Sequence, residues 1–160
     1  MMKKLTRRTM VATLGAAGVG TCVCGLGGGC ATFSKVGNTP AITADTYTVE
    51  GKTLKVLLHK APALTSVGGS VKIIDARLPM PLLVARTGDV TYAVVSLLCP
   101  HRHVEVEYQH QDKLFRCASI GHSKFGLDGK LIKSMTTKES ISHYSAALDL
   151  ADKNHLVVTL

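Results

Sequence analysis

The sequence contains no tryptophan, and aromatic residues make up only 4% of its 160 residues. A core built without large rings must consist mainly of valine, leucine, isoleucine and alanine, and the apolar fraction of 46% is enough for one. The sequence has no long amphipathic run, internal repeat or low-complexity tract, which disfavours helical bundles and repeat arrays. It also has no nucleotide, flavin or second metal motif, so nothing indicates that the chain alone is a complete enzyme.

Acidic residues are also few, and the formal net charge is +8. Part of this excess belongs to residues 1–30, which contain Lys3, Lys4, Arg7 and Arg8 and no acid. The remainder has a surplus of only four positive charges, and no run of consecutive residues forms a basic stripe. A nucleic-acid partner is therefore not expected, because such proteins concentrate their basic residues on one surface.

Residues 1–30 are typical of an export signal, with a basic start followed by a weakly apolar run from Thr9 to Gly25. The segment from Thr6 to Val11 is similar to a twin-arginine signal, although a general secretory signal with two adjoining arginines fits as well. We expect the domain in the periplasm or on the outer face of the bacterial cytoplasmic membrane.

The end of this signal leaves three outcomes open. Leu26 to Cys30 resembles a lipoprotein cleavage site, which would attach a lipid at Cys30. Thr9 to Leu26 is about long enough for an uncleaved anchor in the membrane, and cleavage with release is the third outcome. We predict a linker over residues 31–46, because residues 37–46 are rich in proline and small residues, and a single domain over residues 47–160.

The domain is predicted to be all-β, a small antiparallel sandwich or barrel. Short runs rich in Val, Leu, Ile and Tyr alternate with turns such as Gly68-Gly69 and Asp128-Gly129. The alternation from Val104 to Tyr108 predicts one buried and one wet face. The expected strands are Thr53–Leu58, Val71–Ile74, Leu82–Arg86, Tyr92–Leu97, Val104–Tyr108, Lys113–Arg116, Lys130–Ile132, Tyr144–Leu148 and His155–Thr159.

Only two cysteines, Cys99 and Cys117, lie in the predicted domain, because Cys22, Cys24 and Cys30 belong to the signal region. In an exported protein the simplest interpretation is one disulfide. However, each of the two cysteines has a histidine close by, in Cys99-Pro100-His101 and in Cys117 to His122. Two thiolates and two imidazoles suit either Zn²⁺ or a [2Fe–2S] cluster with split ligation.

The flanks of these two segments resemble the Rieske iron–sulfur domain, whose loops carry C-x-H and C-x2-H. Apolar strands lead into Cys99 and Cys117, and Ser123-Lys124-Phe125 with the following Asp128-Gly129 is similar to the family's S-x-F and D-G turn. The resemblance covers about residues 54 to 159. The second segment departs from the family with C-x4-H, so that the family's histidine position falls on Gly121 and His122 takes the next one. Ligation through His122 requires a bulged loop.

The resemblance implies that Cys99 and Cys117 hold the inner iron and that His101 and His122 hold the outer iron of a Rieske [2Fe–2S] cluster. It also implies that Ser123 donates a hydrogen bond to the cluster. Phe125 has no hydroxyl where high-potential members have a Tyr, so we expect a potential below that of the quinol-oxidising members.

Two further departures from the family concern the surroundings of the cluster. The loop disulfide of the quinol-oxidising members is missing, because Val104 and Ser119 occupy its positions. Residues 133–138 contain no Gly or Pro where the family often has a G-P-A loop that covers the cluster.

Three functions follow. The first is an exported electron-transfer protein, or a small subunit of an oxidoreductase, that meets a redox partner protein or a membrane oxidoreductase complex. The second is a structural or binding module of the same fold without a cluster. The third is a Cys2His2 zinc domain.

Overall fold

The computed structural model describes residues 36–160, which form the all-β fold predicted from the sequence. The predicted export signal, Cys30 and the first part of the predicted linker lie outside the described residues. Within residues 36–160, no helix combines the length and the apolar character needed to cross a bilayer. The elements in chain order are η1 (Ala44–Thr46), β1 (Tyr47–Glu50), β2 (Thr53–Leu57), η2 (Leu58–Lys60), η3 (Pro62–Leu64), β3 (Ser70–Ile73), β4 (Leu82–Arg86), β5 (Tyr92–Ser96), β6 (Val106–Gln109), β7 (Leu114–Cys117), β8 (Lys124–Phe125), β9 (Leu131–Lys133), β10 (His143–Leu148) and β11 (His155–Thr159).

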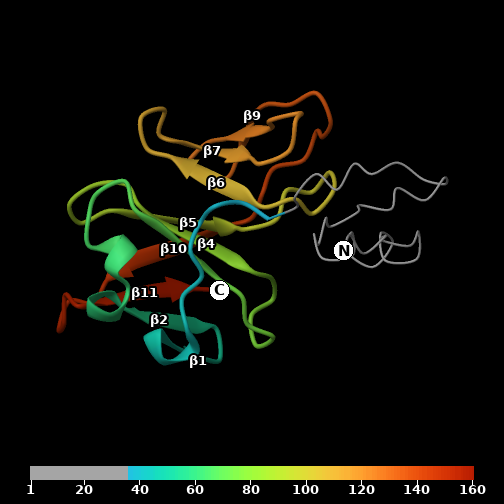
Figure 1. The fold of residues 1–160 in the computed structure, drawn as a ribbon. Coiled ribbons are helices and arrows are strands. Elements are labelled where there is room, and N and C mark those ends of the chain that lie inside the picture. Colours follow the sequence, from blue (N-terminus) through green and yellow to red (C-terminus); the bar gives the residue numbers. More distant parts are fainter. Residues whose placement is uncertain (1–35) are drawn as a thin grey trace, which may run out of the picture. The chain divides into compact units, whose positions relative to one another are not determined.

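The strands form two antiparallel sheets (Figure 1). The larger sheet has seven strands in the order β1-β2-β11-β10-β5-β4-β3, and the smaller sheet has four in the order β6-β7-β8-β9. Strand β10 joins the two halves of the larger sheet, because its start pairs with β5 and its remainder pairs with β11. The smaller sheet packs over β4 and β5.

Strand β4 separates two hydrophobic cores because its side chains alternate between the two faces of the sheet. Leu82 and Val84 belong to the core enclosed by the larger sheet, and Leu83 and Ala85 belong to the core between the two sheets. A strand that is buried on both faces must be apolar throughout, which explains its continuous run of apolar residues before Arg86. The second core also contains Cys99 and Cys117, together with Val95, Leu97, Val106, Tyr108, Phe115, Phe125 and Ile141.

Residues 36–46, predicted as the end of a linker, run along the domain. The segment hydrogen-bonds with β3 through Lys72, whose backbone N–H donates to the carbonyl of Pro40 at 2.8 Å and whose carbonyl accepts from Ile42 at 3.1 Å. At the start of the segment, the backbone N–H of Gly37 donates to the carboxylate of Glu105, and that of Asn38 donates to the carboxylate of Glu107. These bonds attach the segment to both sheets.

One residue of the predicted wet face is buried. The prediction from the alternation is wrong for Glu105, whose exposure is 6%. Its carboxylate oxygens lie 2.9 and 3.0 Å from Nζ of Lys72, which is itself buried in β3. A buried carboxylate must be paired and hydrogen-bonded, and this one receives both the ammonium group and the N–H of Gly37. The ion pair connects the larger sheet with the strand that leads into the smaller one.

Candidate metal centre

Two loops bring three of the four predicted ligands together at one end of the second core. The first loop follows β5 and turns back at once, because the N–H of His103 donates to the carbonyl of Cys99 and the N–H of Cys99 donates to that of Val104. His103 has a φ of 53°, in the left-handed region that allows such a reversal. The second loop leaves β7 at Cys117 and returns to β8 through Ser123, whose carbonyl accepts from the N–H of Cys117 at 2.8 Å.

The loops also hold each other directly. The N–H of Ala118, the first residue of the second loop, donates to the backbone carbonyl of Glu105 at 3.0 Å. Glu105 lies at the exit of the first loop, where it pairs with Leu98 in an isolated antiparallel bridge. The buried ion pair with Lys72 therefore holds Glu105, the residue that contacts both loops, in place.

Three of the four predicted donors meet between these loops. The Sγ atoms of Cys99 and Cys117 and a ring nitrogen of His101 all lie within 4.8 Å of one another. Sγ of Cys99 is 2.9 Å from Nδ1 of His101. Both cysteines are fully buried and neither is part of a disulfide, whereas His101 is half-buried.

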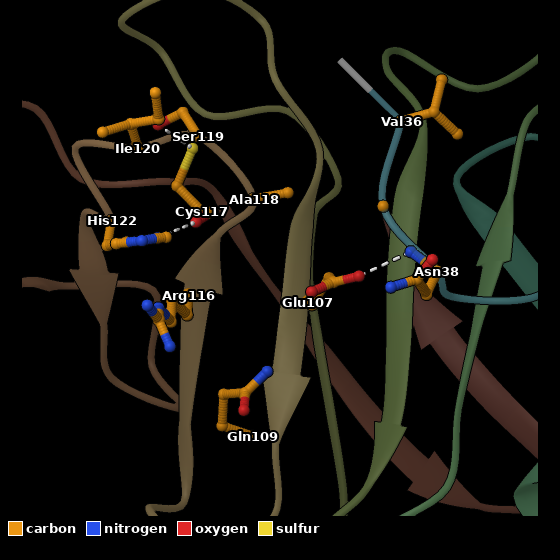
Figure 2. A pocket seen from close by; sticks show the side chains of 11 residues that line it. Val36, Asn38, Glu107, Gln109, Arg116, Cys117, Ala118, Ser119, Ile120 and His122 are labelled. Carbon is orange, nitrogen blue, oxygen red and sulfur yellow. Dashed lines mark hydrogen bonds between the residues drawn. The ribbon is translucent and has the colours of Figure 1, made fainter. Parts of the chain in front are cut away.

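His122, the fourth predicted donor, lies outside this group of three. Its φ is 41° and its N–H donates to the carbonyl of Ser119, so the two extra residues of the C-x4-H loop are used in a tight turn. The imidazole Nδ1 lies 3.4 Å from the backbone carbonyl of Cys117 and lines a cavity on the outer face of β7 (Figure 2). In this conformation the turn directs His122 to the carbonyl of Cys117 and the cavity.

The two cysteines shift each other's pKa in opposite directions. The thiol of Cys99 hydrogen-bonds with the sulfur of Cys117, which lowers the pKa of Cys117 to about 5 even though the residue is buried. The hydroxyl of Ser119, 3.2 Å from the same sulfur, adds to this effect. The same hydrogen bond, together with burial, raises the pKa of Cys99. The pair therefore presents one thiolate, the form of cysteine that binds metal.

A set of hydroxyl groups lies behind the sulfurs. The side chain of Ser123 is fully buried, and its Oγ is 2.8 Å from Oγ of Ser134 and 3.4 Å from Oγ1 of Thr136. Oγ of Ser134 also accepts the backbone N–H groups of Thr136 and Thr137, each at 3.0 Å. The segment without Gly or Pro thus covers Ser123 with hydroxyl groups. Sequence analysis singled out Ser123 and missed Ser134 and Thr136, although their alternation after a strand was a visible signal.

The donor set fits a soft or borderline metal centre in its chemistry. Two buried sulfurs with one thiolate and an imidazole are ligands that iron–sulfur clusters and Zn²⁺ accept. The separation of 2.9 Å between Sγ of Cys99 and Nδ1 of His101 is that of a direct contact. Sulfur and nitrogen ligands around one tetrahedral Zn²⁺ would lie about 3.5 Å apart, given bond lengths of roughly 2.3 and 2.0 Å. Metal binding must therefore open this contact.

Comparison with known proteins gives similarity only to solved structures. No family model matches the chain, and no curated protein matches it. The chain is similar to the plasma membrane Rieske protein PetC3 of the cyanobacterium Synechocystis PCC 6803, with 18% identity over 57% of this chain and 86% of that chain and a TM-score of 0.46. It is also similar to the ferredoxin of carbazole 1,9a-dioxygenase from Nocardioides aromaticivorans IC177, with 15% identity over 59% and 86% and a TM-score of 0.48.

Proposed function

We propose that the chain is a Rieske-type electron-transfer protein in which Cys99, His101, Cys117 and His122 hold a [2Fe–2S] cluster. The observation that carries the proposal is the meeting of two buried sulfurs and an imidazole within 4.8 Å, on two loops between two sheets. A lone histidine near a cysteine is a weak signal. Three such donors, brought from residues 99–101 and 117 to one buried point, are a strong one.

Each residue has a definite task in this proposal. Cys99 and Cys117 would hold one iron as thiolates, and the remaining thiol proton leaves when metal binds. His101 and His122 hold the other iron through neutral imidazoles, which reduce the negative charge of the cluster compared with four cysteines. When bound, the cluster accepts and donates single electrons.

His122 must move for this ligation, and the surrounding residues define the movement. Its imidazole has to leave the carbonyl of Cys117, and the turn from Ser119 has to open. Gly121 packs closely against Thr136: a Cβ added to the glycine would come 3.1 Å from Cγ2 of Thr136. A side chain there would hinder the movement, which is a reason for glycine beside the bulge.

The hydrogen bonds available to the cluster support a potential below that of the quinol-oxidising Rieske proteins. The hydroxyl of Ser123 lies beside Cys99. The same hydroxyl is also 2.8 Å from Oγ of Ser134, which competes for its hydrogen bond. Phe125 is fully buried in the second core and has no hydroxyl to offer. Hydrogen bonds to sulfur raise the potential of a cluster, and Phe125 supplies none at the position where high-potential members have a Tyr hydroxyl. A redox titration that gave a value equal to that of a quinol-oxidising Rieske protein would contradict this expectation.

The partner in this proposal is a redox protein or a membrane oxidoreductase complex of which the chain is a small subunit. The support for placing the chain in the periplasm or on the outer face of the cytoplasmic membrane comes from residues 1–30 alone, which include Cys30. A cluster inserted before export is compatible with the twin-arginine pattern, because that pathway carries folded proteins.

A zinc domain is the second candidate, and one observation favours it. Three donor atoms within 4.8 Å of one another are close enough to reach a single ion once the contact between Cys99 and His101 opens. A structural Zn²⁺ would then take Cys99, His101 and Cys117 and need His122 as its fourth ligand.

Two histidine variants of the full chain, produced with sufficient iron, separate these functions. His122→Asn and His103→Asn are a matched pair, because both positions have positive φ, which asparagine tolerates. The proposal predicts a brown protein whose visible spectrum bleaches with dithionite. It also predicts that His122→Asn changes this spectrum and that His103→Asn leaves it intact.

Each alternative gives a different result. A colourless protein that contains zinc by elemental analysis supports the zinc domain. A folded protein without metal supports the module that lacks a cluster. A coloured protein whose spectrum changes only in the His103 variant would show that the second histidine ligand is misassigned.

A further inference from the structure

The smaller sheet places three basic residues in one row. In the strand register, Glu107 of β6 lies opposite Arg116 of β7, and Arg116 lies opposite Lys124 of β8. Lys124 lies opposite Lys133 of β9, and the β8–β9 register shifts between Lys124 and Phe125. Directly opposed residues of antiparallel strands project from the same face. Arg116, Lys124 and Lys133, called here the basic row, therefore share the outer face of the sheet and cross it within about 10 Å, given a strand spacing of roughly 4.8 Å.

The basic row has no carboxylate partner among residues 36–160. Some basic side chains of the domain do have one, as when Lys72 pairs with Glu105 and Lys130 pairs with Asp128. Like charges that face each other across neighbouring strands are destabilising. Three such residues stand side by side here, and the one acidic residue next to them in the register is Glu107, opposite Arg116.

The natural partner of Arg116 is held by another segment. Glu107 stands directly opposite Arg116, yet its carboxylate accepts the backbone N–H of Asn38 at 2.5 Å. Nε of Arg116 is buried and has no acceptor in the described part of the chain. An unsatisfied buried N–H of a charged group is costly, and a carboxylate of a bound molecule would satisfy it.

A cavity of about 450 Å³ opens in front of this guanidinium group. Figure 2 shows Arg116 and His122 on the same side of the cavity in this view, with Gln109 below them and Asn38 across from them. The cavity adjoins the metal centre, because Cys117 and Ser119 of the second loop also line it. Within the row, Arg116 directly precedes Cys117, and Lys124 directly follows Ser123.

We propose that the outer face of the smaller sheet is the docking surface for an acidic protein partner, one carboxylate of which enters the cavity and binds Arg116 while others face Lys124 and Lys133. The proposal deepens the proposed function, on which it rests for the identification of this partner as the electron donor or acceptor. Docking here places the partner beside the second loop, at the residues next to the sulfur ligands. Arginine suits the position beside the cavity because its planar fork binds a carboxylate in two places.

The test measures binding of a fluorescein-labelled hexaglutamate peptide to the full chain by fluorescence anisotropy at low ionic strength. Neutralising the basic row in Arg116→Gln/Lys124→Gln/Lys133→Gln should weaken binding by about tenfold, as expected for three exposed or half-buried charge pairs. The control Lys52→Gln/Lys55→Gln/Lys153→Gln removes the same charge from the larger sheet and its turns and should change binding less than about twofold. Added salt should reduce the difference between the two variants.

A conservative variant tests the role assigned to arginine. Arg116→Lys retains the charge and loses the fork, so it should bind more weakly than the wild type and more tightly than Arg116→Gln. Equal losses in the two triple variants would show that the peptide senses only net charge and would overturn the proposal. Binding that depends on the row for vesicles of anionic lipid, and not for the peptide, would assign the surface to a membrane instead.

The colour of the same preparations keeps this result separate from the proposed function. A colourless protein whose peptide binding depends on the basic row would retain the docking surface and remove the cluster. A brown protein whose binding does not depend on the row would do the reverse.

Discussion

Replacement of Lys72 by methionine should destabilise the domain far more than the loss of an ordinary surface lysine. Nζ of Lys72 lies 2.9 and 3.0 Å from the two carboxylate oxygens of Glu105, and the two side chains are only 9% and 8% exposed. Methionine keeps most of the side-chain volume and removes the charge. Glu105 is then left buried with the N–H of Gly37, 2.7 Å away, as its remaining donor.

The expected cost is about 3–5 kcal/mol, the range for breaking a buried ion pair by removing one partner. The matched control is Lys130→Met, because Lys130 pairs with Asp128 at 3.0 Å but the two side chains are 81% and 51% exposed. Loss of such a surface pair should cost less than about 1 kcal/mol. Urea unfolding of both variants, followed by circular dichroism, gives the two free energies of unfolding from midpoints and slopes.

The double variant Lys72→Met/Glu105→Met completes the cycle. It should recover most of the loss, because no uncompensated charge remains in the interior. The reasoning would be refuted if Lys72→Met cost no more than Lys130→Met, or if the double variant were as unstable as the sum of the single ones. Since the backbone carbonyl of Glu105 holds Ala118 of the second loop, Lys72→Met should also lower the metal content of the purified protein.

Three further outcomes follow from single residues. Gly69→Ala should lower the free energy of unfolding in urea by at least about 3 kcal/mol, because the added Cβ would overlap the backbone of η3. Gly51→Ala, where the Cβ would meet open space at φ 57°, should lower it by about 1 kcal/mol. Equal losses in the two variants would contradict this. Ser134→Ala should cost about 1–2 kcal/mol by the same assay, because the hydroxyl serves two N–H groups and Ser123; an unchanged midpoint would show that water replaces it. In the metal-free protein, the ultraviolet thiolate band of Cys117, isolated by subtracting the Cys117→Ser variant, should titrate near pH 5. The lowered pKa of Cys117 stabilises the folded state fully above the ordinary thiol value of 9.0, and this stabilisation is lost as the pH falls toward 5. A thiolate band that appears only near pH 9 would contradict the lowered pKa.

Most of the fold could be predicted because its strands are apolar runs separated by turn residues. The nine expected strands correspond to β2 to β7 and β9 to β11. Strands β1 and β8 were missed. β8 has only two residues, too few for any periodicity, and the sequence of β1, Tyr47–Glu50, follows the proline- and small-residue-rich stretch that indicated a linker.

The candidate site was less predictable because its geometry depends on contacts between distant residues. Cysteine and histidine spacing indicated four candidate donors, three of which lie together. The conformation of His122 depends on a turn closed by Ser119 and a positive φ that the sequence pattern does not specify. The burial of Glu105 could not be read from its alternation, since it depends on Lys72, 33 residues earlier. The basic row is also invisible in the sequence, because strand register alone places its three members together.

Pulsed electron paramagnetic resonance of the reduced, iron-replete protein labelled with ¹⁵N-histidine tests the split ligation most directly. The account predicts hyperfine coupling to two histidine nitrogens, one of which disappears in His122→Asn. A reduced cluster without histidine coupling, or a signal that the His122 variant leaves unchanged, would contradict the assignment of His101 and His122 as ligands of one iron.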